Sequence, residues 1–158
     1  MNLVIRPMGC SDKPVVMKIL AAIPEFTPSE VSVAEEVIDS YLAGPADYHI
    51  QVAELDTTVV GYICYGRTPL TESTWDIYWM GVSPTHQQQG VGSALLTFAE
   101  AKIGEAGGRL IIIETSSKPE YEKTRRFHLR HGYRSICQIA DFYALGDDKL
   151  ILTKRWDK

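Results

Sequence analysis

Two glycines stand at the start of a helical pattern in the segment VSPTHQQQGVGSALL, which spans residues 82–96. A helix N-terminus carries unpaired N–H groups and a partial positive charge, so it is a place where phosphate binds. Gly90 and Gly92 would let the main chain approach an anion without a Cβ in the way. The segment 87–92 is therefore interpreted as a main-chain cradle for a pyrophosphate, to which the long Gln side chains can add neutral donors.

The same pair of glycines has a plainer interpretation, a turn that needs a positive φ, and these residues alone leave both open. The segment is not a P-loop, because no Gly-Lys-Ser/Thr follows it. It is also a poor dinucleotide fingerprint, since the third glycine is missing and the preceding elements have an antiparallel pattern rather than a βαβ one.

In its wider context the segment has the pattern V-x-P-x-x-Q-x-x-G-x-G over residues 82–92. This pattern resembles the coenzyme A signature of the GNAT superfamily of N-acetyltransferases. A second segment, YEKTRRFHLRHGY at residues 121–133, resembles the later helix motif of the same superfamily. The resemblance extends over almost the whole chain and implies an enzyme that uses acetyl-CoA as its co-substrate.

The resemblance also implies which residues hold the cofactor. Main-chain groups at 80–82 are expected to pair with the pantetheine arm, and Gln87 stands at the Gln/Arg position of the signature. The acetyl thioester is expected in a gap where the fourth and fifth strands splay apart, and Gly81 is predicted to mark the bulge that begins this splay. The implied cofactor-binding set is Met80, Gly81, Val82, Gln87, Gln88, Gln89, Gly90, Val91, Gly92, Ser93, Tyr121, Thr124 and Phe127.

The expected reaction, direct attack of an amine on the thioester in a ternary complex, requires a neutral amine. At pH 7 a lysine-like amine is neutral about once in 2,500 molecules, a penalty of roughly 4.6 kcal/mol. Asp76 is the predicted base, because it lies six residues before Val82, where histone-acetylating members of the superfamily place a glutamate. Strand parity puts it on one face with Tyr78, Met80 and Val82 unless a bulge intervenes. The alternative is a carboxylate that only caps or solvates a strand end.

The departing thiolate needs a proton. His128 stands where the superfamily usually has a tyrosine for this purpose, and an imidazolium with an ordinary pKa near 6.5 suits the role. The alternative for His128 is an exposed helix histidine. Tyr143 is the reserve donor.

The acceptor amine is expected to contact residues from three segments. Glu25 and Phe26 lie in a proline-rich loop at 23–30, Tyr78 lies in the aromatic strand, and Asp141 lies in the segment 141–149. For that last segment, turn chemistry at Gly146 is an adequate alternative explanation.

Hydrophobic periodicity predicts the elements that position these residues. Two helices follow the first strand, the first capped by Ser11 or Asp12 and the second by Thr27 or Ser29. The apolar strand RLIIIET is expected to be buried on both faces, with Glu114 as a paired structural carboxylate. The predicted fold is α/β (α+β mixed), a mostly antiparallel seven-stranded sheet splayed at strands 4 and 5, with helices on both faces. Strands are predicted at 3–8, 49–55, 58–66, 73–82, 109–115, 133–142 and 148–156, and helices at about 12–23, 31–42, 91–106 and 119–131.

Length and composition set the class of protein. The 158 residues fit a single domain, 1–158, and the net charge of −4 argues against a nucleic-acid surface. Without a membrane-length apolar run or a signal-peptide layout, the expected compartment is the cytosol. The three cysteines form no metal-ligand cluster, and Cys64 and Cys137 are expected in the core.

Three functions remain open on the sequence. The first is acetylation of the primary amine of a small molecule such as an amino acid or a derivative of one. The second is acetylation of a protein or peptide, which an open cleft free of the loop 24–30 would favour. The third is a non-catalytic acyl-CoA sensor, for which His128 in place of tyrosine is the motivating feature. A homodimer also stays open.

Overall fold

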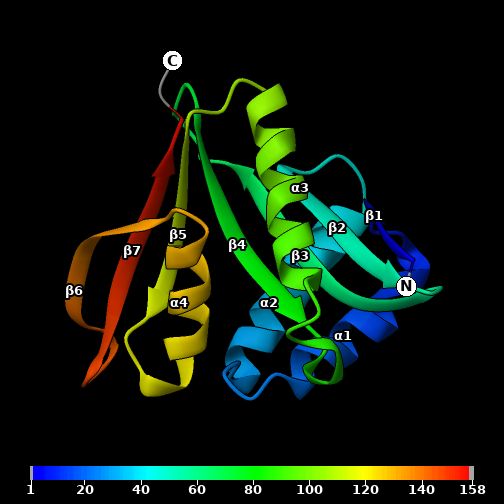
Figure 1. Cartoon of the computed structure of the whole chain (residues 1–158), viewed down its shortest axis with the longest axis horizontal. Helices are drawn as coiled ribbons and strands as arrows, with labels where there is room; N and C mark the ends of the chain where they lie inside the picture. The colour runs from blue at the N-terminus through cyan, green and yellow to red at the C-terminus, as the bar shows by residue number, and fades with distance from the viewer. Residues whose placement is uncertain (1, 157–158) are drawn as a thin grey trace.

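The computed structural model describes residues 2–156 and contains one seven-stranded sheet in the order β1-β2-β3-β4-β5-β7-β6 (Figure 1). Strand β4 runs parallel to β5 and every other neighbouring pair is antiparallel, which confirms the predicted fold class. The strands are β1 (Leu3–Pro7), β2 (Tyr48–Leu55), β3 (Thr58–Arg67), β4 (Thr74–Val82), β5 (Leu110–Ser116), β6 (Arg134–Ala144) and β7 (Asp147–Arg155). The helices are α1 (Lys13–Ala22), α2 (Pro28–Leu42), α3 (Val91–Glu105) and α4 (Glu122–Arg130), and α4 follows a 3-10 turn at Pro119–Tyr121.

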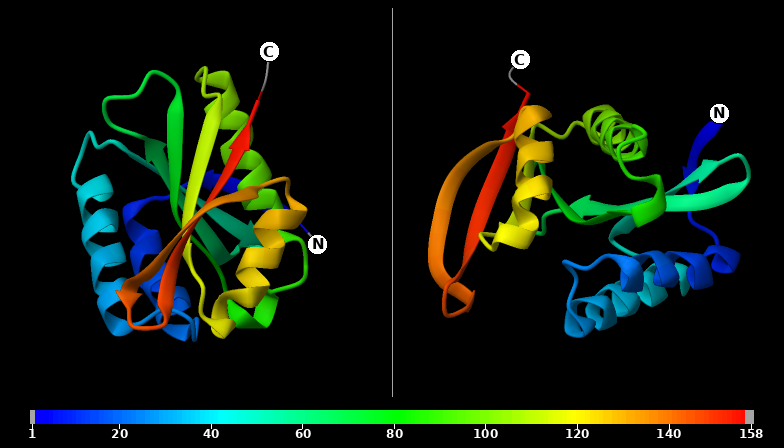
Figure 2. Two further views of the ribbon diagram at one scale, coloured as in Figure 1. Left: turned by 90° about the vertical axis from the view of Figure 1, so that its left-hand side faces the viewer. Right: turned by 60° about the horizontal axis from the view of Figure 1, so that its bottom comes forward.

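The helices form a layer on each side of the sheet. Helices α3 and α4 lie on one face, and α1 and α2 lie on the other, beneath β2 to β4 only (Figure 2, right). In α3, Val91, Leu95 and Ala99 recur every four residues and are fully buried against the sheet. No helix within residues 2–156 is both long and apolar enough to cross a membrane.

Local hydrogen bonds fix the first two helices. Thr27 caps α2, because its side chain accepts a hydrogen bond from Glu30 N at 3.1 Å. The helix therefore begins at Pro28, earlier than the hydrophobic pattern predicts. Asp12 precedes α1, but its carboxylate accepts from Gly9 N at 2.8 Å and from the Arg6 guanidinium at 2.7 Å instead of capping. This bidentate pair ties β1 to the start of α1.

The sheet splays between β4 and β5, as predicted. Residues 74–77 of β4 pair with 110–113 of β5, and the two strands then diverge while β5 stays paired with β7 as far as Ser116 (Figure 1). The bulge that begins the splay lies at Tyr78, because Ile77 pairs with Tyr65 and Trp79 pairs with Cys64. The prediction of a bulge at Gly81 is wrong. Gly81 stays in register, and a Cβ there would lie 2.8 Å from Ile23 Cδ1 of the chain that follows α1.

The bulge also switches the faces of β4. Trp79 packs against the core formed with α1 and α2, whereas Met80 and Val82 pack against the core formed with α3. The parity that placed Asp76 on one face with Met80 and Val82 is therefore wrong, because one extra residue separates them.

Two burial predictions fail for the same reason. On β5, Ile111 and Ile113 are buried, but Ile112 is only half-buried and Glu114 is exposed in an ion pair with Lys149. Cys137 is exposed on β6, whereas Cys64 is buried as expected. Helices cover β5 and β7 on one face only, and β6 is the edge of the sheet (Figure 2).

Candidate active site

The segment before α3 presents a row of free main-chain donors. Gly90 occupies the N-cap position with a φ of 83°, and Gln88 has a φ of 63°, so the chain curls into a concave nest. Within residues 2–156, the N–H groups of 88–93 donate to no protein acceptor, and the first helical bond runs from Ala94 N to Gly90 O at 3.0 Å. The positive-φ interpretation thus holds for Gly90, and the same conformation leaves the N–H groups available for an anion.

Gly92 has a different role from Gly90. A Cβ at Gly92 would lie 3.5 Å from the Phe127 ring of α4 and 3.7 Å from Val82 Cγ2 at the end of β4. Gly92 therefore lies where α3, α4 and the open edge of β4 meet. Because it has no side chain, these three elements can approach one another closely.

The edge of β4 that faces the gap carries main-chain groups that neither β3 nor β5 pairs. Ser83 N donates to Val60 O of β3 at 2.7 Å, so by alternation the main-chain groups of Val82 and Met80 point away from β3, into the gap. The Gln87 side chain reaches back and donates to Val82 O at 3.3 Å. The Val82 N–H is therefore positioned to meet a ligand lying in the gap.

Tyr121 bridges the gap at its wide end. Its hydroxyl donates to Glu25 O at 2.9 Å, with a Glu30 carboxylate oxygen 3.2 Å away. Partial burial and the charge of Glu30 raise its pKa, so the phenol stays protonated. This contact joins the start of α4 to the loop 23–27 and the first turn of α2 across the splay. The predicted pantetheine contact did not include this role.

Asp76 lies on the face of the sheet covered by α1 and α2. Its carboxylate accepts a hydrogen bond from Thr68 Oγ1 at 2.6 Å. The bulged Tyr78 shares this face, with its ring 5.5 Å from that of Tyr48. Partial burial, and then the charge of Asp76, raise the pKa of Tyr78 to about 12. Asp76 and Tyr78 thus stand together beside the last paired residues of β4, where the gap begins.

His128 is buried, with only 4% of its surface exposed. Burial lowers its pKa from the ordinary 6.5 to about 4, and the nearby His131 acts in the same direction. Its Nδ1 has no hydrogen-bond partner, and its ring packs edge-on against Tyr133. The expected imidazolium is therefore wrong for neutral pH: His128 is a neutral N–H donor, and it is not an exposed helix histidine either.

His131 is a residue that the sequence analysis missed. Its Nε2 lies 3.0 Å from Ser93 Oγ at the start of α3, and its Nδ1 lies 2.7 Å from Phe127 O. Its ring also packs on Phe127 at 4.3 Å between centroids. His131 therefore braces the first turn of α3 against α4. The spacing of four residues indicates the Phe127 contact, but nothing local indicates Ser93.

The remaining predicted residues are more scattered. Tyr143 is half exposed on β6, and partial burial and then Glu114 raise its pKa. Asp141 has a φ of 56° and accepts from Gly146 N at 2.7 Å, so it shapes the β6–β7 hairpin. Phe26 packs against the core of α1 and α2, and Thr124 is half-buried on α4.

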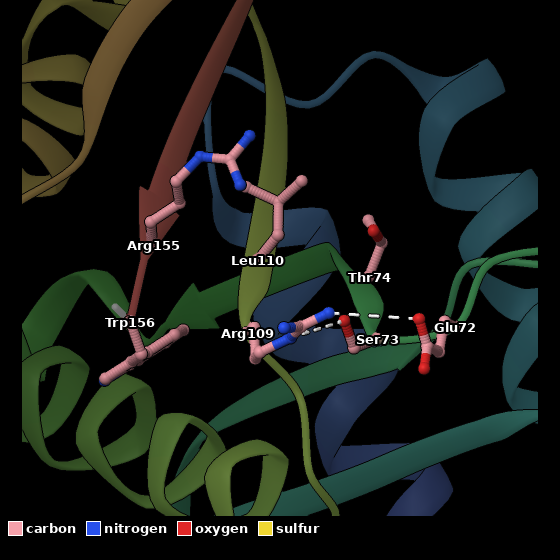
Figure 3. Close-up of a pocket in the computed structure, with 7 residues that line it drawn as sticks. All are labelled: Glu72, Ser73, Thr74, Arg109, Leu110, Arg155 and Trp156. Atoms are coloured by element: carbon pink, nitrogen blue, oxygen red, sulfur yellow. Dashed lines mark hydrogen bonds and ion pairs between the residues drawn. The ribbon is translucent and has the colours of Figure 1, made fainter. Parts of the chain in front are cut away.

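A cleft of about 430 Å³ lies at the opposite end of the β4–β5 pair (Figure 3). There Arg109 donates to Ser73 Oγ at 3.2 Å and lies 3.9 Å from the Glu72 carboxylate. The cleft contains none of the predicted site residues, and of its two arginines Arg109 is paired with Glu72. Its lining is Glu72, Ser73, Thr74, Arg109, Leu110, Arg155 and Trp156.

Known proteins share both the sequence pattern and the fold. The sequence model of the acetyltransferase (GNAT) family matches residues 16–133. No curated protein matches the chain. A crystal structure from Desulfovibrio desulfuricans, of a protein assigned to the GNAT family of acetyltransferases, has 37% identity and a TM-score of 0.92 over 98% of this chain and 99% of that one.

Two more distant structures share the fold. The PaiA N-acetyltransferase of Thermoplasma acidophilum, in complex with coenzyme A, is 14% identical with a TM-score of 0.75 over 99% of this chain and all of that one. The ribosomal-protein-alanine N-acetyltransferase of Brucella melitensis is 17% identical with a TM-score of 0.77 over 97% and 99%. A family match over most of the chain, together with the splayed sheet and the free N–H groups before α3, shows that this chain belongs to the GNAT family of acetyltransferases.

Proposed function

We propose that the chain is a single acetyltransferase domain that transfers the acetyl group of acetyl-CoA to the primary amine of a small molecule, such as an amino acid or a derivative. One observation carries the proposal. The unpartnered N–H groups of 88–93 adjoin the gap in the sheet, so an anionic linker bound there leads into the gap. The residues present fit the cofactor, because neutral main-chain donors suit a diphosphate without requiring a Lys or Arg.

The chain's groups divide the work between the two faces of the sheet. Bound acetyl-CoA supplies an activated thioester carbonyl. The Val82 N–H faces the gap and is the donor for the oxyanion that develops when the amine attacks. Asp76, on the face covered by α1 and α2, takes the proton from the amine. A water molecule carries this proton, because the aspartate side chain is short. The departing thiolate takes its proton from the Tyr143 hydroxyl or from water, and the neutral His128 ring can offer the sulfur a hydrogen bond but no proton.

The hydrogen bond between Tyr121 and the loop before α2, called the Tyr121 strap below, favours a small acceptor over a peptide. The hydrogen bond from the Tyr121 hydroxyl to Glu25 O holds the loop 23–27 across the wide end of the gap. A peptide would need that end open, whereas a small amine would not, and Glu25, Phe26 and Tyr78 are its proposed contacts.

The test is release of free thiol from acetyl-CoA with a panel of amino acids, small amines and peptides. We expect turnover with a small amine, and Asp76→Asn should lower kcat about a hundredfold, the usual contribution of a general base. Asp39→Asn on α2 is the matched control, since Asp39 is an exposed carboxylate paired with Lys13.

The outcomes separate the candidate functions. Turnover of peptides alone would replace the small-molecule proposal by the peptide one. Tight binding of acetyl-CoA without thiol release from any acceptor would indicate a sensor. Equal activity of the two variants would remove Asp76 from the mechanism.

A further inference from the structure

A histidine of α4 is hydrogen-bonded to the cofactor cradle, the row of free N–H groups of residues 88–93. His131 Nε2 lies 3.0 Å from Oγ of Ser93, the last residue of this row. Residues 83–93 contain no Lys or Arg. Among the side chains of residues 2–156, that of His131 is the titratable one that bonds to the cradle. A proton on His131 can therefore act on the cradle through Ser93.

The two hydrogen bonds of the His131 ring determine which nitrogen carries the proton. Phe127 O can only accept, and it lies 2.7 Å from Nδ1, so Nδ1 carries the proton of the neutral ring. Nε2 is then an acceptor, and the Ser93 hydroxyl donates to it. Ser93 Oγ has no other hydrogen-bond partner within residues 2–156. With a neutral His131, the one proton of this hydroxyl is therefore used by the ring and is not available to a ligand.

Protonation of His131 reverses the bond to Ser93. An imidazolium donates from both nitrogens, so Nε2–H would donate to Ser93 Oγ and release the hydroxyl proton for another acceptor. An anion held by the free N–H groups of 88–93 would be such an acceptor. The positive ring would also attract the negative charge of that anion. Both effects favour the protonated ring when an anion is bound.

The charged groups around His131 leave its ring free to change state. Lys154 of β7 donates to His131 O at 2.8 Å and to a Glu100 carboxylate oxygen of α3 at 3.2 Å, so its charge is already paired. His128 on α4 is neutral at pH 7, because burial lowers its pKa to about 4. Arg130 precedes His131 and is exposed, so solvent screens its charge. Since histidine exchanges its proton near neutral pH, a bound anion can shift the ring toward its charged form.

We infer that His131 is a positioning residue that takes up a proton from solvent when the diphosphate of acetyl-CoA binds, and that the Ser93 hydroxyl then turns from His131 to the ligand. The inference rests on the proposed function for the identity of the anion, and it adds a pH dependence to cofactor binding. A group that gains a proton on binding strengthens the complex at low pH, and this contribution is lost as the pH rises.

The test is titration calorimetry of acetyl-CoA binding in buffers of different ionisation enthalpy, which counts the protons taken up. At pH 7 the wild type should take up roughly half a proton more than His131→Gln, whose amide is polar but does not titrate. The 3′-phosphate of the ligand titrates near pH 6, but it is the same for every variant, so the difference belongs to the protein. Between pH 6 and 8, the affinity of the wild type should fall about threefold to tenfold more than that of His131→Gln.

Two further variants separate this role from a structural one. His86→Gln is the matched control, because His86 lies on the turn before the cradle and its Nδ1 contacts Thr85 Oγ1 instead. Its proton uptake should equal that of the wild type. Ser93→Ala keeps His131 but removes the hydroxyl, so its uptake should fall toward that of His131→Gln. A cooperative thermal transition in each variant shows that it is folded.

The outcomes distinguish this inference from the proposed function. A wild type that does not bind acetyl-CoA would refute the proposed function and this inference with it. Binding with equal proton uptake in the wild type and His131→Gln, or full uptake in Ser93→Ala, would overturn the inference alone. Loss of the uptake in His86→Gln would also overturn it, because the proton would then belong to the turn before the cradle.

Discussion

Single residues decide whether the segment before α3 can hold an anion. Gly90 has a φ of 83° and open space where a Cβ would stand, so a substitution there is limited by backbone strain rather than by a clash. Asparagine and aspartate tolerate the left-handed region better than other residues and differ from each other in charge. The pair Gly90→Asn and Gly90→Asp therefore separates conformation from electrostatics.

Gly90→Asp should weaken acetyl-CoA binding on the order of 10- to 100-fold more than Gly90→Asn, because it places a carboxylate beside the diphosphate. Titration calorimetry of both variants measures the difference. Equal dissociation constants would mean that the diphosphate does not lie against Gly90.

His128 gives a second prediction at this scale, for stability against pH. Its pKa is about 4 in the folded protein and about 6.5 when unfolded, so the unfolded chain binds more protons between these values. The free energy of unfolding should therefore fall as pH drops from 6.5 to 4, by at most about 3 kcal/mol from this group. Urea unfolding at several pH values should show a shallower fall for His128→Phe. An identical pH dependence would contradict a neutral buried imidazole.

The sequence identifies Gly90 and His128 as site residues, but it does not give the protonation state of His128. The identity of Gly90 and of the donors around it follows from a local motif. The protonation of His128 could not be predicted, because it depends on how deeply the folded chain buries the ring. His131 was missed because its contact with Ser93 joins two helices that are distant in the chain.

Among the elements, the start of α4 and the loop 23–27 are joined across the wide end of the gap by one hydrogen bond. Tyr121→Phe removes the hydroxyl that donates to Glu25 O. The loop should then move more freely, and KM for the acceptor should rise about threefold to tenfold while acetyl-CoA affinity stays constant. The loss of stability should be about 1 kcal/mol.

Tyr41→Phe is the matched control for this element, since the Tyr41 hydroxyl also donates to a main-chain oxygen, Met8 O at 3.1 Å, away from the gap. It should lower stability by a similar amount without changing KM. Steady-state kinetics with both substrates distinguishes the two variants, and a parallel change in both would mean that the strap has no specific role.

Element order could be predicted from periodicity, whereas the position of the bulge could not. The extra residue at Tyr78 is defined only by the register against Tyr65 and Cys64 on β3. Gly81 looked like the bulge because it is a glycine in a strand, but its role is to admit Ile23. A glycine in a strand thus does not by itself distinguish a bulge from close packing of another side chain against the strand.

At the scale of the molecule, the cofactor cradle should be a source of stability. Acetyl-CoA at 100 times its dissociation constant should stabilise the fold by about 2.7 kcal/mol, which corresponds to a rise in Tm of roughly 5–10 °C for a chain of this size. Because residues 83–93 contain no Lys or Arg, the rise should change little between low and high salt at equal saturation. Differential scanning calorimetry checks both points, and an unchanged Tm would contradict binding to the native state.

The bulge at Tyr78 has a consequence for how this protein can be altered. Beyond it, neighbouring positions on one strand belong to separate surfaces: Trp79 faces α1 and α2, and Met80 faces α3. Selection or engineering can therefore remodel one surface by point substitution and leave the other untouched. Deleting a single amino acid at the bulge would instead exchange the two surfaces at once, so the fold should tolerate replacement of this residue but not its removal.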